Sequence, residues 1–285
     1  MNQPQSRFFG DNPRLHYLEW NPDGRDTLIL MHGNTANAWW WQPVVDAMRS
    51  PMRVIALDSR GHGDSGWVRP PAYHPDDYAR DLAALAEHCV SGRPIVAGHS
   101  MGGLCALAFA ALYPGRARAL IVVDSALSSS EQRDRFLRRL RSLPVITYPD
   151  LATAKARFRL MPKEGHIAPA LLHTIAEKSL MAADDDRWTL KFDRESFFGS
   201  DGLETRDVVR RLRIPTLLVR GEHSRIMPAS DAHFALETNE WLELRTIAGA
   251  HHHVLLEHPV ALAHEIERFV AQVLASDQAA RDQEV

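Results

Sequence analysis

Long apolar runs are scarce in this 285-residue sequence. No stretch approaches the roughly 18 uncharged apolar residues that a membrane-spanning helix needs. The first residues, MNQPQSRFFGDNP, also lack the basic segment followed by an apolar segment that marks a secretory signal. We therefore expect a cytoplasmic protein that does not enter a membrane.

Cysteine and surplus charge are also nearly absent. Cys89 and Cys105 both fall in segments with helical patterns, so two buried thiols are expected rather than a disulfide bond. The net charge of −3 and the pI near 6.6 provide no field that would attract nucleic acid or an anionic membrane. Repeats and low-complexity tracts are missing too, and 45% hydrophobic residues suffice for the core of an enzyme-sized globular protein.

What the sequence does contain is a regular alternation of short apolar runs and helical patterns. The runs have the continuous apolar character of strands buried on both faces, and they cover residues 27–31, 53–58, 94–98, 119–124, 214–221 and 241–247. Helical patterns occupy residues 38–48, 75–89, 101–112 and 259–274. This alternation predicts an α/β fold with a mostly parallel, doubly wound sheet.

The two ends of the chain differ from this rhythm. Residues 8–20 alternate loosely before a turn signature at 21–24, and they are expected to form a two-stranded edge piece. The polar tail from Ser276 is expected to be disordered.

The alternation also stops after Asp124. From residue 125 to residue 205 no five-residue buried strand occurs, and prolines at positions 144, 149, 162 and 169 interrupt the helical patterns. The segment 125–205 is therefore predicted to be a helical cap, inserted into a core formed by residues 1–124 and 206–285. Four aromatic residues are expected to pack the cap against the core: Trp188, Phe192, Phe197 and Phe198.

The segment 94–103, PIVAGHSMGG, contains the GxSxG pattern of a nucleophile elbow. An apolar strand precedes Ser100 and an alanine-rich helix follows it, which is the context that the motif requires. Gly98 and Gly102 permit the close backbone approach that the strained turn needs. Ser100 would then stand at the start of the helix, where the amide of Met101 and the helix dipole favour an oxyanion.

Four motifs, in their order and spacing, make residues 8–274 resemble the α/β-hydrolase fold superfamily: HGN at 32–34, DSRGHGDS at 58–65, GHSMGG at 98–103 and AHHHVLLEHP at 250–259. The resemblance implies a core sheet with a helical cap after the sixth strand. It also implies that Ser100 is the nucleophile and His252 the general base. The oxyanion hole would be formed by the backbone amides of Asn34 and Met101.

The choice of His252 among three consecutive histidines rests on register. In the superfamily a histidine after glycine is followed five residues later by glutamate and two residues after that by proline. Glu257 and Pro259 fit His252, although His251 then stands where glycine is usual. Three adjacent imidazoles do not converge on one ion without a contorted backbone, so no metal site is expected.

A serine stands where most members of the superfamily carry the acid of the triad. In the run Gly221 to Ser224 the usual GxxD pattern ends in Ser224. Serine brings no charge to stabilise an imidazolium, and loss of that charge costs about 10⁴-fold in turnover. Asp124 is the preferred replacement, because some branches of the superfamily take their acid from the end of the sixth strand. Glu222 and the absence of a functioning acid stay open as alternatives.

Other polar and aromatic residues near the motifs carry weaker expectations. His32 either shapes the oxyanion loop or contacts substrate, and the side chain of His99 is expected to pack away from the site. One of the tryptophans at 39–41 is expected to line a pocket, because successive helical residues face different directions. Structural or solvated positions are expected for Arg60, His62, Asp64 and the arginines 133, 135, 138, 139 and 141.

Together these features predict a cofactor-free serine hydrolase that cleaves a carboxylic ester or related acyl compound through an acyl-enzyme on Ser100. The expected partner is a small-molecule substrate. Two alternatives stay open: a cofactor-independent dioxygenase of the same fold that uses a His252–Asp124 dyad, and a ligand-binding protein without turnover. Hydrolysis of a carbon–carbon bond in a diketone is a variant that the same triad allows.

Overall fold

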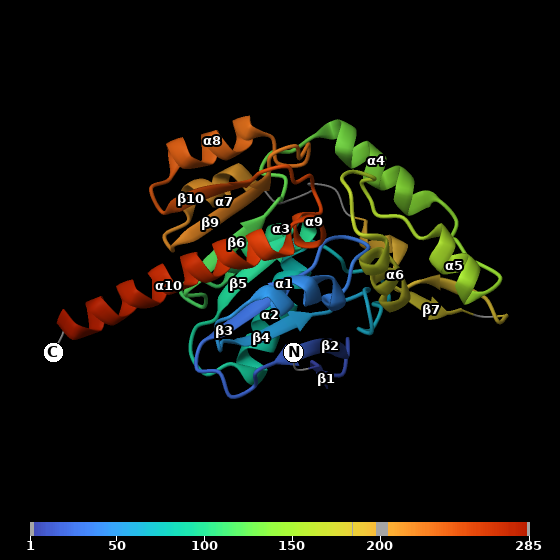
Figure 1. Ribbon diagram of the computed structural model, residues 1–285, viewed down its shortest axis with the longest axis horizontal. Helices are drawn as coiled ribbons and strands as arrows, with labels where there is room; N and C mark the ends of the chain where they lie inside the picture. Colours follow the sequence, from blue (N-terminus) through green and yellow to red (C-terminus); the bar gives the residue numbers. More distant parts are fainter. Residues whose placement is uncertain (1–2, 184, 198–204, 284–285) are drawn as a thin grey trace.

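An eight-stranded sheet forms the centre of the computed structural model, which describes residues 3–183, 185–197 and 205–283 (Figure 1). The strands are β1 (Gln5–Phe9), β2 (Leu15–Trp20), β3 (Thr27–Met31), β4 (Arg53–Leu57), β5 (Ile95–His99), β6 (Ala119–Val123), β9 (Thr216–Gly221) and β10 (Leu242–Ile247). Their order in the sheet is β1-β2-β4-β3-β5-β6-β9-β10. Only β2 runs antiparallel to its neighbours β1 and β4, and the other pairs are parallel. The predicted α/β class and the edge piece are therefore confirmed.

Both faces of the sheet are buried, which explains the continuous apolar runs in the sequence. In β5, for example, Ile95 and Ala97 belong to one hydrophobic cluster and Val96 to the other. The first face is covered by η1 (Ala38–Trp41), α1 (Gln42–Ala47), α9 (Val254–Glu257) and α10 (Pro259–Gln283), and the second by α2 (Pro75–Cys89), α3 (Met101–Leu112), α7 (Thr205–Arg211) and α8 (Ala229–Thr238). None of the helices in the described ranges is both long and apolar enough to cross a membrane.

Two predicted helices differ from the observed ones. The helix expected over residues 38–48 begins as the 3-10 turn η1, whose start is capped because Asn37 Oδ1 accepts a hydrogen bond from the amide of Trp39. The disordered tail expected from Ser276 is wrong, because α10 continues to Gln283 and extends beyond the sheet (Figure 1). Within this end, Gln278 Nε2 donates to Asp282 Oδ1 at 2.7 Å, an i,i+4 contact that supports a helix.

The two cysteines are free thiols, as predicted. Cys105 is fully buried in α3, and Cys89 is half-buried at the end of α2, where its Sγ donates to the carbonyl of Leu85. Burial raises the pKa of Cys89 to about 11. Both thiols are therefore protonated and unreactive at neutral pH.

A segment inserted between β6 and α7 lies beyond one end of the sheet (Figure 1). We call its described part, residues 125–183 and 185–197, the inserted segment. It contains α4 (Glu131–Ser142), α5 (Leu151–Arg157), α6 (Pro169–Lys178), β7 (Leu180–Ala182), β8 (Trp188–Leu190) and η2 (Arg194–Ser196). The helices agree with the patterns in the sequence. The hairpin of β7 and β8 was not predicted, because strands of three residues are too short to give a periodic signal.

The DSRGHGDS loop at residues 58–65 attaches the inserted segment to the core. The amide of Gly63 donates to the carbonyl of Lys191, and the amide of Asp193 donates to the carbonyl of Gly61. The buried Phe192 ring stacks on the His62 ring, with 6.3 Å between the centroids. The loop is thus structural, as expected.

The other residues named for this loop have structural partners as well. Arg60 forms a bidentate ion pair with Asp81 on α2, and Asp64 accepts a hydrogen bond from Lys191. Of the aromatic residues expected between cap and core, Phe197 is also buried and Trp188 is half-buried. Phe198 lies outside the described residues.

A matched pair of glycine substitutions tests the packing at the elbow. A Cβ added to Gly98 would lie 2.1 Å from the carbonyl oxygen of Gly102, so we expect Gly98→Ala to lose at least about 3 kcal/mol of unfolding free energy. A Cβ on Gly115 meets nothing within 4 Å, and its φ of +78° limits the cost of Gly115→Ala to about 1–2 kcal/mol. Urea denaturation measures both values. Equal losses would contradict the steric argument.

Candidate active site

Ser100 occupies a single-residue turn between β5 and α3. Its backbone has φ 55° and ψ −116°, in the sparsely populated region that costs about 1–3 kcal/mol and is typical of functional sites. Two hydrogen bonds to the end of β6 hold this turn: the amide of Ser100 donates to the carbonyl of Val123, and Ser125 Oγ donates to the carbonyl of Ser100. The strained turn lifts the Ser100 side chain out of the sheet at its carboxyl edge.

His252 approaches Ser100 from the loop that follows β10. Its Nε2 lies 3.1 Å from Ser100 Oγ, and only 3% of the residue is exposed. The buried carboxylate of Glu257 fixes the register of this loop, because it accepts hydrogen bonds from the amides of His251 and His253 on either side of His252. Of the three consecutive histidines, the structure thus brings His252 to Ser100.

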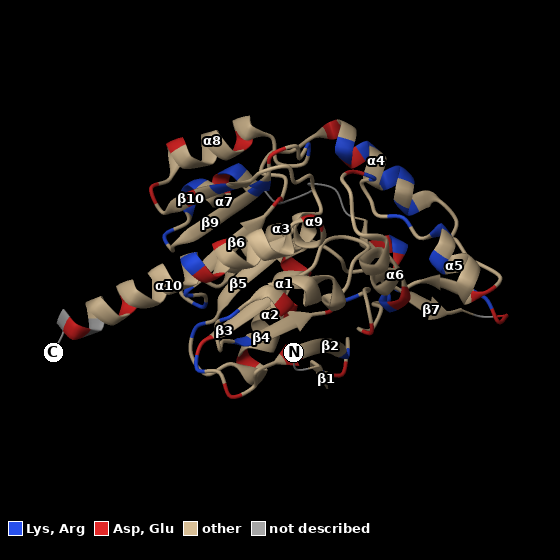
Figure 2. Ribbon diagram, in the orientation of Figure 1, with Lys and Arg blue, Asp and Glu red and all other residues tan. Residues whose placement is uncertain are grey.

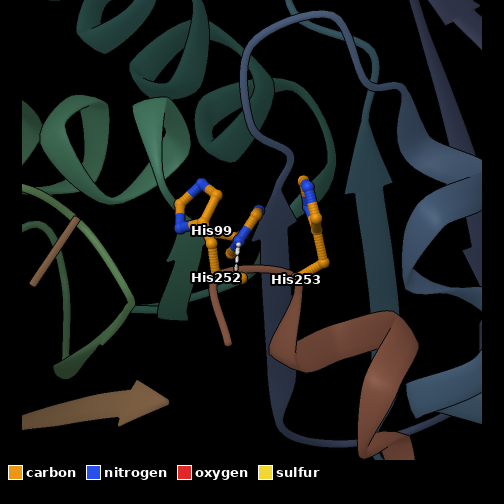
Figure 3. A group of neighbouring side chains, drawn as sticks. All are labelled: His99, His252 and His253. Carbon is orange, nitrogen blue, oxygen red and sulfur yellow. Dashed lines mark hydrogen bonds between the residues drawn. The ribbon is translucent and has the colours of Figure 1, made fainter. Parts of the chain in front are cut away.

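Figure 3 shows His99 hydrogen-bonded to the backbone of His252, and each neighbouring imidazole has a partner of its own. His99, at the end of β5, uses Nε2 to donate to the carbonyl of His252 at 2.9 Å, and its ring lies 4.7 Å from the His252 ring. The expectation that His99 packs away from the site is therefore wrong. His253 Nε2 donates to the carbonyl of Pro162 in the inserted segment, and His251 Nδ1 contacts Glu257.

Three buried histidines of this site lie close enough together to be considered as metal ligands: His99, His252 and His253. Their ligand nitrogens lie within 4.8 Å of one another. One nitrogen of each ring already has a partner: His99 Nε2 and His253 Nε2 bond to backbone carbonyls, and His252 Nε2 contacts Ser100 Oγ. In this arrangement the three residues act as hydrogen-bonded imidazoles.

Asp124 follows β6 and lies beneath His252, with 3.7 Å between Asp124 Oδ1 and His252 Nδ1. The carboxylate is fully buried and accepts two hydrogen bonds, from Ser224 Oγ at 2.6 Å and from the amide of Gly221 at 2.9 Å. Burial raises the pKa of Asp124 to about 6, although both hydrogen bonds lower it. Burial also lowers the pKa of His252 to about 3, so its imidazole is neutral at pH 7.

Ser224 and Glu222, the other two residues considered for the acid position, have different surroundings. Ser224 is buried, and its Oγ accepts from the amide of Ile226 while it donates to Asp124. Glu222 is half-exposed and accepts from the amide of Gly249 at the surface. The role of Ser224 as a hydrogen-bond partner of Asp124 was missed in the sequence. The signal was a hydroxyl at the usual acid position in a chain with an aspartate after the sixth strand.

A cavity of about 220 Å³ opens beside Ser100 and His252. The residues named for the oxyanion hole, Asn34 and Met101, both line it. Met101 is the first residue of α3, and amides in the first turn of a helix have no acceptor within the helix. His32 does not line the cavity, because it is fully buried and bonds to backbone atoms of Gly33 and Ser59.

The tryptophans of η1 divide as predicted. Trp40 lines the cavity, and Trp41 is fully buried in the core. Trp39 is half-buried, with the ammonium of Lys178 4.1 Å from its ring centroid. One tryptophan therefore belongs to the site and two do not.

The inserted segment supplies much of the cavity wall through Arg133, Phe136, Leu137, Met161, Pro162 and Phe197. The presence of Arg133 corrects the expectation that the five arginines of α4 all form a solvated face. Arg133 is half-buried and lines the cavity, whereas Arg135, Arg138, Arg139 and Arg141 are exposed. The helical spacing alone did not show which of them turns inward, since that depends on how α4 packs on the core.

Comparisons with known proteins identify the family. The model of the Alpha/beta hydrolase family matches residues 28–265, and the chain belongs to this family. A 2-(acetamidomethylene)succinate hydrolase of Mesorhizobium japonicum is 26% identical over 85% of this chain and 87% of its own length. Esterase Rv0045c of Mycobacterium tuberculosis is 26% identical over 72% of this chain and 68% of its own.

Solved structures support the fold in the same way. The crystal structure of an E-2-(acetamidomethylene)succinate hydrolase superposes with a TM-score of 0.80 at 24% identity. The superposition covers 94% of this chain and 99% of the other. A thioesterase domain from the curacin biosynthetic pathway gives a TM-score of 0.79 at 21% identity, with coverage of 93% and 99%. The chain is thus an α/β-hydrolase, and its relatives support a hydrolase activity.

The role of Glu257 in setting the His252 loop can be tested by stability. Glu257→Gln leaves one acceptor oxygen and places an NH₂ group against amide donors, so we expect a loss of about 2–3 kcal/mol of unfolding free energy. The control Glu222→Gln changes a half-exposed side chain and should stay within about 0.5 kcal/mol of the wild type. Urea denaturation compares them. A neutral Glu257→Gln would mean that the loop keeps its register without this carboxylate.

Proposed function

We propose that the protein is a cofactor-free serine hydrolase that cleaves a carboxylic ester or related acyl compound, with Ser100 as nucleophile. The observation that carries the proposal is the 3.1 Å contact between Ser100 Oγ and His252 Nε2. An imidazole that is neutral at pH 7 takes the serine proton as Ser100 attacks the carbonyl carbon. The same imidazole then protonates the leaving group, and water hydrolyses the acyl-enzyme by the reverse use of these groups.

Asn34 and Met101 are proposed to stabilise the tetrahedral intermediate through their backbone amides. Both residues line the cavity with Ser100, and Met101 lies at the positive end of α3. Donors of this kind contribute about 10²–10³-fold to turnover, because they are already oriented toward the position where the negative charge develops.

Asp124 is proposed to stabilise the His252 imidazolium. Among the described residues it is the carboxylate within 4 Å of His252 Nδ1, and its other contacts hold it in place without neutralising it. The 3.7 Å separation is longer than a hydrogen bond, as is common before a substrate is bound. When His252 becomes charged, attraction to Asp124 in this buried site favours a shorter contact.

The inserted segment is proposed to act as the cap of the site. Its side chains form part of the cavity wall and its Pro162 carbonyl bonds to His253, so it covers the reacting groups and limits the access of water. The names of relatives, among them an esterase and a lipase of Mycobacterium tuberculosis, support acyl hydrolysis on a small molecule. The contact of His252 with Ser100 favours hydrolysis over the dioxygenase, in which a His252–Asp124 dyad acts without the serine.

Labelling and substitution test the roles of Ser100 and Asp124. A fluorophosphonate probe should label Ser100 in the wild type and leave Ser100→Ala unlabelled. Asp124→Asn should lower kcat/KM for a short-chain 4-nitrophenyl ester by about 10³–10⁴-fold, because the imidazolium loses its counter-charge. Glu222→Gln should match the wild type.

The opposite outcomes identify the alternatives. A large loss in Glu222→Gln, with Asp124→Asn unaffected, would move the acid to Glu222. Oxygen consumption with a heteroaromatic hydroxyl substrate, unchanged in Ser100→Ala, would support the dioxygenase. A wild type that is neither labelled nor active would leave a ligand-binding protein.

The pH dependence of kcat/KM tests the pairing of Asp124 with Ser224. The pKa of Asp124 is about 6, so kcat/KM should fall as the pH drops below that value and the carboxylate takes up a proton. Ser224→Ala removes a donor that favours the charged carboxylate, which raises the pKa of Asp124 and should move this acid limb to higher pH. An unchanged limb in Ser224→Ala would show that the limb belongs to another group.

A further inference from the structure

One half-buried cation, Arg133, lies in the wall of the cavity that contains Ser100. It extends from the first turn of α4, where its amide bonds to the capping hydroxyl of Ser130. One guanidinium nitrogen, Nη2, donates to the carbonyl of Ser128 at 2.8 Å, which anchors the side chain. A guanidinium has five N–H donors, and within the described residues this is the one hydrogen bond that the Arg133 side chain forms.

No carboxylate forms an ion pair with Arg133 anywhere in residues 3–183, 185–197 and 205–283. Asp134 and Asp231 are near enough to act on it electrostatically. Asp231, however, accepts a hydrogen bond from Ser128 Oγ and forms an ion pair with Arg206. Arg133 therefore lines the cavity without a direct counter-ion from the described chain.

The rest of the cavity wall makes this charge unusual. The side chains around it are largely apolar and include Leu104, Phe136, Leu137 and Ile226. Burial among them lowers the pKa of Arg133 from its ordinary value, yet an arginine stays protonated at neutral pH. A charge in apolar surroundings is costly unless an opposite charge pairs with it, and a carboxylate pairs with a guanidinium through two parallel hydrogen bonds.

The surface outside the cavity has the same sign. α4 carries five arginines and only two acidic residues, in a chain whose net charge is −3 (Figure 2). Arg141 is paired with Glu195, and Arg135 has Glu131 4.0 Å away, but Arg138 and Arg139 are exposed. A basic helix beside the cavity raises the local concentration of anionic ligands.

We propose that the substrate is an acyl compound that carries a carboxylate, and that Arg133 binds this carboxylate while the apolar cavity holds the carbon chain between it and the scissile bond. The proposal rests on the serine hydrolase activity proposed above and names its substrate class. Arg133 is then the residue that sets specificity, and it takes no part in the bond cleavage itself.

Matched substrates separate charge from shape. The mono-4-nitrophenyl ester of adipic acid carries a free carboxylate, and its primary amide is nearly the same size but neutral. The corresponding esters of pimelic and suberic acid extend the chain, because the best separation between carboxylate and ester is to be found by experiment. We expect the wild type to prefer the acid over the amide in kcat/KM for at least one chain length.

Three variants assign that preference to one residue. Arg133→Gln should lower kcat/KM for the acid by about 100-fold, mainly through KM, and leave the amide nearly unchanged. Arg133→Lys should restore part of the preference, because lysine keeps the charge but not the bidentate geometry. Arg138→Gln changes an exposed arginine of the same helix and should behave as the wild type. Thermal melting of each variant identifies any that fails to fold.

The outcomes distinguish this proposal from the proposed function. Turnover of both esters without preference, or an equal loss on both in Arg133→Gln, would overturn the carboxylate proposal and leave the hydrolase intact. If the wild type turns over neither ester, calorimetric binding of the same acid and amide to Ser100→Ala still decides the matter. Tighter binding of the acid that disappears in Ser100→Ala/Arg133→Gln would support the carboxylate site, and equal binding would overturn it.

Discussion

The geometry of the site depends on the hydrogen bonds that the buried carboxylate of Asp124 accepts. A charge with no exposure to solvent must be compensated by donors, and here the amide of Gly221 and the hydroxyl of Ser224 supply them. Gly221 is the last residue of β9 and Ser224 lies in the loop that follows, so the carboxylate joins the end of β6 to the end of β9 and its loop. It also faces the loop that carries His252. One group thereby relates three segments that are far apart in the sequence.

The charged group, Asp124, and its neutral partner, Ser224, come from elements that differ in rigidity. Asp124 follows directly on a central strand whose residues are all fully buried, so its backbone position is set by the sheet. Ser224 lies in a loop and needs only to donate a hydroxyl hydrogen. The charge is thus held by the rigid element, whereas the more adaptable element carries a neutral group.

Much of the fold was predictable because local pattern and burial agree. The central strands are apolar at every position since both faces of the sheet are covered, and the elbow motif lies between β5 and α3 as expected. The hairpin of the inserted segment and the length of α10 were not predictable in this way. Short strands and polar helix ends depend on tertiary contacts, such as the antiparallel pairing of Leu180 with Leu190.

Motif and order predicted Ser100, Asp124 and His252 for the site, and the structure brings these three residues together. Three features were not predicted: the inward turn of Arg133, the contact of His99 with His252 and the pairing of Ser224 with Asp124. Each joins residues from different elements, and the sequence gives no distance between such elements. Predicting them requires knowledge of how α4 packs on the core and how the His252 loop packs against β5.

The run of three histidines shows that neighbouring residues of the same type are not interchangeable in the structure. Glu257 holds the backbone on both sides of His252, so the loop does not slide by one residue to present a neighbour instead. His251 contacts Glu257 and His253 bonds to Pro162, so each adjacent ring already has its own partner. If His252 is the base, as proposed, the run of three histidines holds no reserve: His252 is the member in contact with Ser100 Oγ, and its loss leaves His251 and His253 bound to other partners.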